Sequence, residues 1–365
     1  MHKINKSILI ICPYPLGHAP SQRFRFEQYL SQLSQVGFHW VAKPFYSVET
    51  WKILYEPGMY GRKFFGLVQG FFSRIGTLFS VASYDYVLIH REATPVGPPL
   101  FEFLTAHLFG RKIIYDFDDS IWLPNTSAEN KLAAKLKWHS KVAAICRWSY
   151  RISGGNRYLC EFACQYNPRT TINPTTIDTD ALHNPQRYAP SNTHKSLITI
   201  GWTGTHSTLK YLEALEPVLA SLEMKFQNQI QFLVIANKPP RLNLKTLKFV
   251  PWTVEREVED LLHMDIGIMP LTDDLWAKGK CGFKALQYMA LQIPTLASPV
   301  GVNTEIIQHG ENGLLCNSDE EWESNLTQLI ENNQVRRSLG KAARETVVAR
   351  YSVSSNTSNF LSLFE

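Results

Sequence analysis

The segment KCGFKALQYMALQ, Lys280 to Gln292, lies between two short apolar runs, DIGIMPL (265–271) and IPTLAS (293–298). A helix between two buried strands is the repeating unit of a parallel α/β sheet. Apolar residues that recur at helical spacing predict the face that packs on the sheet. They are Phe283, Leu286, Met289, Ala290 and Ile293.

The same helix carries three polar residues, Lys280, Lys284 and Gln287, at spacings of about one turn. Glycines stand at Gly279 and Gly282, where the helix is expected to begin. Ligands of open α/β sheets bind at the carboxyl ends of strands, where such a helix starts. We therefore expect the polar trio to face a ligand.

Apolar runs alternate with helical stretches in two series, which predicts two Rossmann-like α/β domains with a ligand cleft between them. We expect an N-terminal domain over 1–185, a polar linker over 186–195 and a C-terminal domain over 196–345. A C-terminal helix over 346–365 is expected to pack back on the first domain. The first-domain strands are expected at 7–12, 38–45, 84–90, 111–117 and 150–154. Those of the second are expected at 196–202, 230–236, 247–252, 265–271, 294–298 and 313–316.

Composition excludes several classes of protein. The chain has 365 residues, 44% of them hydrophobic, which is enough to form large cores. The apolar run after MHKIN is shorter than a secretory signal needs, and we interpret it as the first strand. No uninterrupted apolar run has the length of a membrane span. Six cysteines without disulfide or zinc spacing predict reduced thiols in a cytoplasmic protein.

The basic residues are concentrated in the first half. Residues 1–185 hold 20 Lys and Arg against 13 Asp and Glu, whereas 186–365 hold 17 against 19. Within the first half, GRKFFGLVQGFFSRIG (61–76) combines basic residues with four phenylalanines, a composition that suits the surface of an anionic membrane. The alternative is an ordinary amphipathic helix that packs on its own domain.

The turn after the first strand, CPYPLGHAPSQRFRFEQYL, contains only Gly17, so it lacks the glycines of a dinucleotide site. Arg23 and Arg25 near the following helix start could receive an anionic acceptor. Surface arginines without a ligand are the alternative.

Two neighbouring strands of the first domain are each followed by charged residues. The first is followed by IHREATPVGPP, with His90, Arg91 and Glu92, and the next ends in YDFDD, with Asp116, Asp118 and Asp119. Either Asp118 or Asp119 could accept a proton from an attacking hydroxyl, or the pair could hold Mg²⁺. A helix N-cap is the structural alternative, and it would explain one aspartate.

The second domain opens with ITIGWTGTHSTLKYL, a strand followed by small and hydroxyl residues that include Thr203, Gly204 and Thr205. Backbone amides of such a turn can approach a phosphate, although a helix-capping turn would have the same composition. If this turn and the helix start near Gly282 lie at one sheet edge, Lys284 would contact the same anion. Gln287 would then hydrogen-bond the hydroxyls of an attached ribose.

These residues resemble the retaining glycosyltransferases of the GT-B fold, family 4 type, over essentially the whole chain. The resemblance is most specific in IGWTGTHSTLKYL, in HREATPVGPPLFE with YDFDD, and in the run from Asp265 to Leu315 that ends in QIPTLASPVGVNTEIIQHGENGLL. It implies a nucleotide-sugar site that also includes Trp252, Cys281, Gly282 and Glu305, with Lys280 and Lys284 as catalytic lysines. It implies an acceptor side with Arg23, Arg25, Arg91, Glu92, Asp118 and Asp119.

The chain departs from the usual Glu-x7-Glu signature of that family. Gln287 occupies the position of the second Glu and Gly279 that of the first. A subgroup with the pattern GK-C-x-FK-x-LxYMA matches at Lys280 and Lys284, and this match favours an active enzyme.

The resemblance implies sugar transfer from a nucleotide diphosphate sugar, most simply a UDP-sugar, to a glycan or lipid-linked acceptor. It implies no metal, no further cofactor and no nucleic-acid partner. We expect a cytoplasmic protein. A peripheral position on the inner face of the cytoplasmic membrane is compatible with this expectation. A sugar nucleotide epimerase and a silent sugar nucleotide binding protein are the alternatives.

Overall fold

The computed structural model describes residues 6–124, 137–188 and 197–365, which form two compact units. Unit 1 comprises Met1–Thr175 and Asn356–Glu365, and unit 2 comprises Thr176–Ser355. The division lies before the linker expected at 186–195, of which 189–195 fall outside the described residues. Over 346–365 the structure has the end of one helix, α16 (Asn333–Arg350), and a second, α17 (Val353–Leu361).

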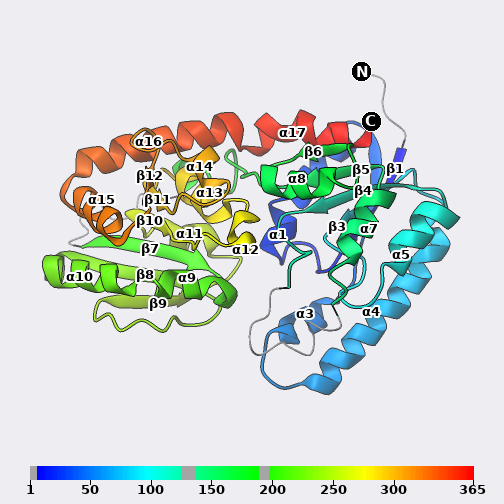
Figure 1. Cartoon of the computed structure of the whole chain (residues 1–365), viewed down its shortest axis with the longest axis horizontal. Helices are drawn as coiled ribbons and strands as arrows, with labels where there is room; N and C mark the ends of the chain where they lie inside the picture. The colour runs from blue at the N-terminus through cyan, green and yellow to red at the C-terminus, as the bar shows by residue number, and fades with distance from the viewer. Residues whose placement is uncertain (1–5, 125–136, 189–196) are drawn as a thin grey trace. The chain divides into compact units, whose positions relative to one another are not determined.

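Unit 1 is built on a parallel six-stranded sheet in the order β2-β1-β3-β4-β5-β6 (Figure 1). Each strand predicted for this half is present. The additional strand β6 escaped prediction because its three residues, Thr-Thr-Ile, are only partly buried and too few to show a pattern. The strands are β1 (Lys6–Cys12), β2 (Phe38–Pro44), β3 (Tyr86–His90), β4 (Lys112–Phe117), β5 (Arg151–Gly154) and β6 (Thr170–Ile172).

Two helices of unit 1, α3 and α8, begin at polar N-cap residues. Ser47 accepts a hydrogen bond from the Thr50 amide at the start of α3, and Asn156 accepts one from the Leu159 amide at the start of α8. The helices are α1 (Pro20–Arg23), α2 (Leu30–Gln35), α3 (Val48–Leu54), α4 (Tyr60–Val81), α5 (Leu100–Phe103), α7 (Lys141–Trp148) and α8 (Arg157–Cys164).

The C-terminal residues complete the core of unit 1. Phe360 stacks on Tyr29 with ring centroids 4.3 Å apart, and the Tyr86 hydroxyl donates to the Phe364 carbonyl at 2.5 Å. Phe360 and Phe364 are buried. Segments from the two ends of the chain therefore stabilise the same sheet.

Unit 2 also contains a parallel six-stranded sheet, in the order β12-β11-β10-β7-β8-β9. Every strand predicted for this half is present. Sequential strands run outward from β7 on one side and from β10 on the other, so the topology switches between these two central strands. The strands are β7 (Ile198–Gly204), β8 (Ile230–Ala236), β9 (Leu247–Pro251), β10 (Ile266–Met269), β11 (Thr295–Ala297) and β12 (Leu314–Leu315).

The quoted segment forms α13, which packs on the central strands of unit 2. An added Cβ on Gly267 of β10 would lie 2.6 Å from the Tyr288 ring, so this glycine allows the close contact. The helices of unit 2 are α9 (Leu209–Glu213), α10 (Glu216–Phe226), α11 (Glu257–Leu261), α12 (Leu275–Lys278), α13 (Phe283–Ala290), α14 (Asn303–Ile306), α15 (Asp319–Glu331) and α16.

All six cysteines lie in the described parts of the chain and are free thiols. Cys164 is exposed and the others are buried. Burial raises the pKa of Cys12, Cys146, Cys160 and Cys316 to about 12, so these thiols remain protonated.

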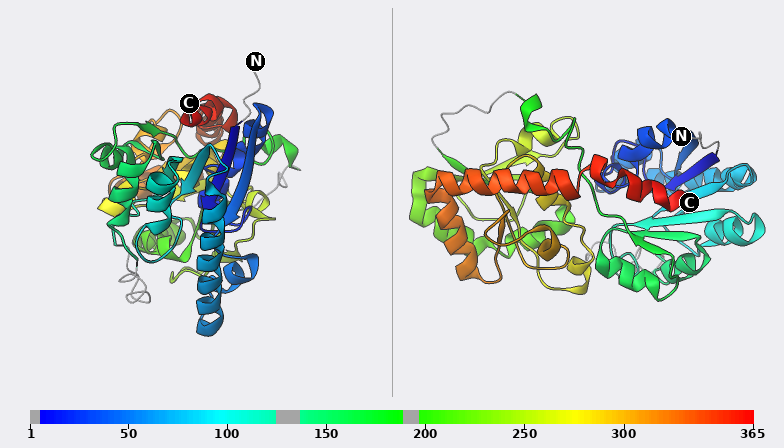
Figure 2. Two further views of the ribbon diagram at one scale, coloured as in Figure 1. Left: turned by 90° about the vertical axis from the view of Figure 1, so that its right-hand side faces the viewer. Right: turned by 90° about the horizontal axis from the view of Figure 1, so that it is seen from above.

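The helix α4 lies at the edge of unit 1, and its N-terminal part, beside α3, extends beyond the strands (Figures 1 and 2). Its buried Arg74 donates to three backbone carbonyls, those of Ala93 at 2.7 Å, Lys43 at 2.8 Å and Cys12 at 2.9 Å. One guanidinium therefore joins α4 to the ends of β1 and β2 and to the segment after β3.

We expect Arg74→Met to lower the free energy of unfolding by about 3 kcal/mol, because three carbonyls would lose a charged donor. Urea unfolding followed by circular dichroism measures the change. The matched control is Arg62→Met on the exposed part of the same helix. Equal stability of the two variants would show that the Arg74 hydrogen bonds contribute nothing net.

Candidate functional site

The carboxyl ends of β7 and β10, on either side of the switch in strand order, bring the predicted donor-site residues of unit 2 together. Lys284, on the first turn of α13, lies against Gly204 at the end of β7. A Cβ added to Gly204 would come within 2.8 Å of Lys284 Cε and 2.4 Å of the Trp202 ring. Lys284 Nζ lies 5.5 Å from the centroid of that ring. The glycine therefore makes room for a lysine ammonium at the switch point, where open α/β sheets bind ligands.

Tyr288, which the sequence analysis did not single out, fixes this arrangement. Its hydroxyl accepts a hydrogen bond from the Thr203 amide at 2.8 Å, and its side chain is fully buried. Because Tyr288 lies four residues after Lys284, the two share one face of α13. The bond holds the helix, and with it Lys284, at the end of β7. A tyrosine one turn beyond the lysine, on the same face of the helix, was the available signal.

The turn after β7 corrects the expectation that its amides are open to a phosphate. The Thr203 amide donates to Tyr288, the Thr205 amide to the Thr208 hydroxyl at 3.3 Å, and the His206 amide to Asn237 Oδ1 at 2.8 Å. Thr205 and Thr208 form a capping box, which is the alternative that the sequence left open. The lysine ammonium of Lys284 is the positive group that lies beside this turn.

Gln287 also differs from its prediction. It is buried, and its Nε2 donates to Glu257 Oε1 at 3.2 Å and lies 3.3 Å from His183 Nε2. The expected position beside Lys284 on a solvent-facing surface is wrong, because residue 287 points into the interior of unit 2. An amide suits this place, because a carboxylate at residue 287 would be buried against that of Glu257.

The other predicted donor-site residues lie around the start of α13 or at neighbouring strand ends. Gly282 adopts a left-handed backbone (φ 69°), and a Cβ there would meet Ile306 at 2.2 Å. Lys280 Nζ lies 5.2 Å from the Trp276 ring centroid, and Cys281 is buried. Trp252 follows β9 and its amide donates to the Ala236 carbonyl, whereas Glu305 lies on α14.

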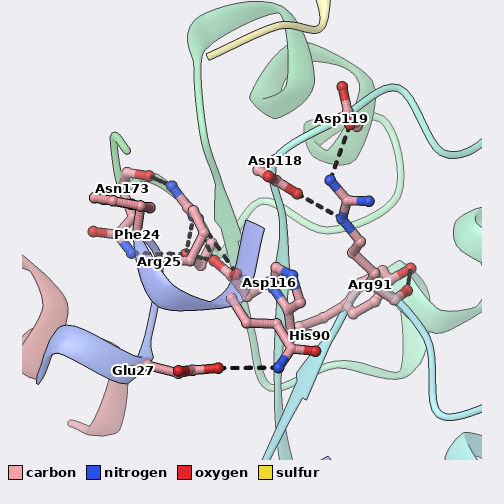
Figure 3. Close-up of polar contacts among 12 residues, drawn as sticks. Phe24, Arg25, Glu27, His90, Arg91, Asp116, Asp118, Asp119 and Asn173 are labelled. Atoms are coloured by element: carbon pink, nitrogen blue, oxygen red, sulfur yellow. Dashed lines mark hydrogen bonds and ion pairs between the residues drawn. The ribbon is translucent and has the colours of Figure 1, made fainter. Parts of the chain in front are cut away.

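In unit 1, Arg91 connects the two predicted acceptor-side aspartates. Its Nε donates to Asp118 Oδ1 at 2.7 Å and its Nη2 to Asp119 Oδ2 at 2.9 Å (Figure 3). Arg91 follows β3 directly and has a left-handed backbone (φ 59°), which is uncommon for arginine. This turn directs the guanidinium toward the end of β4. Burial raises the pKa of the Asp118 carboxyl, but Arg91, together with His90 and Arg25, outweighs that effect and lowers the pKa below its ordinary value.

Arg25 is a structural residue, which corrects its assignment to the acceptor side. It is buried, forms an ion pair with Asp116, and donates to the Asn173 carbonyl and to Ser153 Oγ (Figure 3). His90 Nδ1 lies 2.7 Å from the other Asp116 oxygen. Burial opposes ionisation of Asp116, but Arg25 and His90 hold the pKa of this carboxyl well below its usual range. Asp116 therefore cross-links the strand ends of unit 1.

The other two residues predicted for the acceptor side, Glu92 and Arg23, contact different groups. Glu92 forms an ion pair with Lys141 at 2.9 Å, and the Arg23 guanidinium lies 5.1 Å from the centroid of the Phe24 ring. The alternative that Asp118 or Asp119 caps the start of a helix is not seen over residues 118–124, which form bends and turns. Over 6–124, 137–188 and 197–365 no group of three metal-ligating side chains occurs, and Arg91 competes with Mg²⁺ for both aspartates.

Comparison with known proteins identifies the class of unit 2. Residues 197–332 match the family model "Glycosyl transferases group 1". This stretch is therefore similar to the glycosyl transferases of group 1. It contains the Gly204 and Lys284 site. A segment of 96 residues is 30% identical to N-acetyl-alpha-D-glucosaminyl L-malate synthase of Bacillus anthracis; the match covers 26% of this chain and 24% of that protein. The chain thus aligns with about a quarter of the length of this curated relative.

Solved structures of glycosyltransferases share the fold over nearly the whole chain. Anabaena Alr3699/HepE in complex with UDP and glucose is 13% identical, covers 98% of both chains and has a TM-score of 0.65. Sucrose-phosphate synthase of Thermosynechococcus elongatus is 15% identical, with the same coverage and a TM-score of 0.66. A glycosyltransferase of Rickettsia africae is 12% identical and has a TM-score of 0.67, over 99% of this chain and 98% of that one. The two Rossmann-like units therefore have the GT-B fold of these structures.

We expect Tyr288→Phe to weaken nucleotide diphosphate binding by about tenfold, because the Thr203 amide would lose its partner and α13 its bond to β7. Isothermal titration with UDP measures the change. Tyr211→Phe on α9, another buried tyrosine of unit 2, is the control. Unchanged affinity in a folded Tyr288→Phe protein would show that the hydrogen bond does not position Lys284.

Proposed function

We propose that the protein is a retaining glycosyltransferase that moves a hexosyl group from a UDP-sugar to an acceptor hydroxyl. The observation that carries this proposal is the contact of Lys284 with Gly204 at the topological switch point of a domain similar to the glycosyl transferases of group 1. The complexes of HepE with UDP and with UDP-glucose support the uridine donor. Gly279 stands where the family signature has its first glutamate. We therefore propose Lys284, which would contact the leaving diphosphate, as the main charged group of this site.

In the proposed reaction the bond between the anomeric carbon and the diphosphate oxygen breaks, and the acceptor oxygen bonds to the same face of that carbon. The proton of the acceptor hydroxyl passes to the departing diphosphate, so charge and atoms balance. Lys284, supported by Lys280 and by the N-terminal end of α13, stabilises the negative charge that develops on the diphosphate. Lysine supplies the charge that a divalent cation would otherwise provide, so we propose transfer without a metal or further cofactor.

Unit 1 supplies the acceptor-side groups in this proposal. Because its pKa is lowered, Asp118 is ionised at neutral pH and is a weak base. We therefore assign it, with Asp119, to orienting the acceptor hydroxyl by a hydrogen bond rather than to removing its proton beforehand. Arg91 keeps the two carboxylates in place, 2.7 and 2.9 Å from its nitrogens.

For the acceptor we propose a glycan or a lipid-linked precursor in polysaccharide or glycolipid assembly. For the location we propose the cytoplasm, with a peripheral position on the inner face of the cytoplasmic membrane.

A screen for stabilisation by UDP-, GDP-, ADP- and dTDP-sugars tests the donor, because a ligand that binds only the folded state raises the apparent Tm. We expect stabilisation by UDP-sugars, together with slow donor hydrolysis. Stabilisation without hydrolysis or transfer would instead indicate a silent binding protein. Formation of an epimeric sugar nucleotide without acceptor would indicate an epimerase.

We expect Lys284→Ala to lower kcat/KM at least about 100-fold and to weaken UDP binding, because the leaving diphosphate would lose its nearest cation. Donor hydrolysis and isothermal titration measure the two effects. Lys278→Ala is the matched control, since Lys278 forms an exposed pair with Asp273 at 3.2 Å. Wild-type affinity and rate in Lys284→Ala would contradict the phosphate assignment.

We expect Asp118→Asn to lower turnover at least about tenfold while UDP affinity changes less than about twofold, since Asp118 belongs to unit 1 and the donor site to unit 2. Transfer kinetics beside UDP titration separate the effects. Asp85→Asn, at the opposite end of β3, is the control. A comparable loss of UDP affinity in Asp118→Asn would show that the acceptor-side assignment is wrong.

A further inference from the structure

The helix α4 reverses the usual arrangement of buried and exposed side chains. Its buried positions are occupied by small residues and by Arg74, whereas its large apolar side chains point away from unit 1. The buried residues are Gly66, Gly70, Arg74, Thr77 and Val81. The large exposed ones are Tyr60, Phe64, Phe65, Phe72, Ile75 and Phe79, with exposed fractions between 53% and 85%. A soluble helix ordinarily shows the reverse arrangement.

The contacts on the inner face fix this orientation. A Cβ on Gly66 would lie 2.4 Å from Thr50 of α3, and one on Gly70 would lie 2.4 Å from the Phe45 ring. One turn further, Arg74 makes its three hydrogen bonds to backbone carbonyls. No large side chain fits these positions, so α4 cannot rotate to bury its phenylalanines.

The outward residues form one continuous apolar face. At 100° per residue, Phe64, Phe65, Phe72, Ile75 and Phe79 fall within an arc of about 100°, centred opposite the buried stripe, and extend over about 22 Å of the helix. The partly exposed Val68 lies within the same arc. Phe71 lies outside it and packs edge-on against Phe45 with ring centroids 5.4 Å apart. The outward face of α4 therefore excludes Phe71, which is half-buried against Phe45.

The charges on α4 indicate what this face contacts. The helix has no acidic residue, and Arg62 and Lys63 lie at its N-terminal end. A basic end beside an apolar aromatic face is complementary to anionic lipid, whose headgroups attract Lys and Arg while the acyl boundary receives the phenylalanines. Of the two basic residues, Lys63 donates to the Glu56 carbonyl, and Arg62 is exposed.

Alone among helices of the described residues, α4 is long and apolar enough to cross a membrane. Its inner stripe is nevertheless bonded to unit 1 along its length, with Arg74 buried in its C-terminal half. A spanning position would break these contacts, so the helix is suited to lie in the plane of the interface.

We propose that the outward face of α4, from Phe64 to Phe79, docks on an anionic lipid surface and holds unit 1 there. The proposal goes beyond sugar transfer, because none of the residues of this face was assigned to either candidate site. It extends the proposed membrane location by naming the residues that make the contact.

Sedimentation with vesicles tests the proposal, using the full chain without nucleotide or acceptor. Vesicles of equal parts phosphatidylcholine and phosphatidylglycerol provide the anionic surface, and pure phosphatidylcholine provides the neutral one. We expect the wild type to bind the anionic vesicles, with affinity that falls as salt rises. Phe64→Ser/Phe72→Ser/Phe79→Ser should reduce the affinity at least about 100-fold.

The matched control replaces three equally exposed apolar residues elsewhere, as Leu100→Ser/Leu108→Ser/Met224→Ser, and should bind like the wild type. Arg62→Gln/Lys63→Gln should weaken binding to anionic vesicles about tenfold and change binding to neutral ones little. Near-UV circular dichroism and Tm verify that each variant is folded. Since no step requires sugar transfer, an inactive protein would still give a valid result.

Three results would overturn the proposal. One is a wild type that ignores anionic vesicles at low salt, and another is a folded phenylalanine variant that binds them as well as the wild type. The third is a wild-type dimer in light scattering that the phenylalanine variant converts to monomer, without vesicle binding by either. That outcome would assign the outward face of α4 to a second copy of the chain.

Discussion

The hydrogen bond from the Thr203 amide to the Tyr288 hydroxyl joins the two elements on which the candidate donor site depends. It connects the end of β7 to the middle of α13 across the switch in strand order. Two glycines make the approach possible, Gly267 beneath the Tyr288 ring and Gly204 beside Lys284. The lysine is thus positioned by backbone geometry and a buried hydroxyl, while the amides of residues 203, 205 and 206 are bonded within the protein.

In unit 1, ion pairs rather than a buried hydroxyl hold the side chains at the strand ends in place. Asp116 is enclosed by Arg25, His90 and Ser153, so it connects strand ends and is not available for chemistry. Two residues further along the chain, Asp118 is held from one side by Arg91. The side chains of residues 116 and 118 leave the same strand end, yet that of Asp116 is 3% exposed and that of Asp118 is 14% exposed.

The outward face of α4 illustrates how side-chain size can determine which surface of a helix is buried. Glycines at residues 66 and 70 allow α3 and Phe45 to approach, and Arg74 satisfies carbonyls that would otherwise lack donors. These contacts stabilise the helix on unit 1 without using its phenylalanines. Large apolar side chains therefore remain exposed along one face of the helix.

The sequence by itself determined the two parallel sheets, because strand length, apolar runs and turn residues are local properties. It also brought Lys284 to the start of a helix at a strand end, since spacing and the flanking glycines define that place. The strand β6 was missed because three partly buried residues carry no periodic signal. Only the tertiary structure decided that Gln287 faces Glu257, that Arg25 is bonded to Asp116, and that the amides of residues 203 and 206 are bonded to Tyr288 and Asn237. Each of these depends on residues far apart in the sequence, and a side chain's partner across such a distance cannot be read from its spacing along the chain.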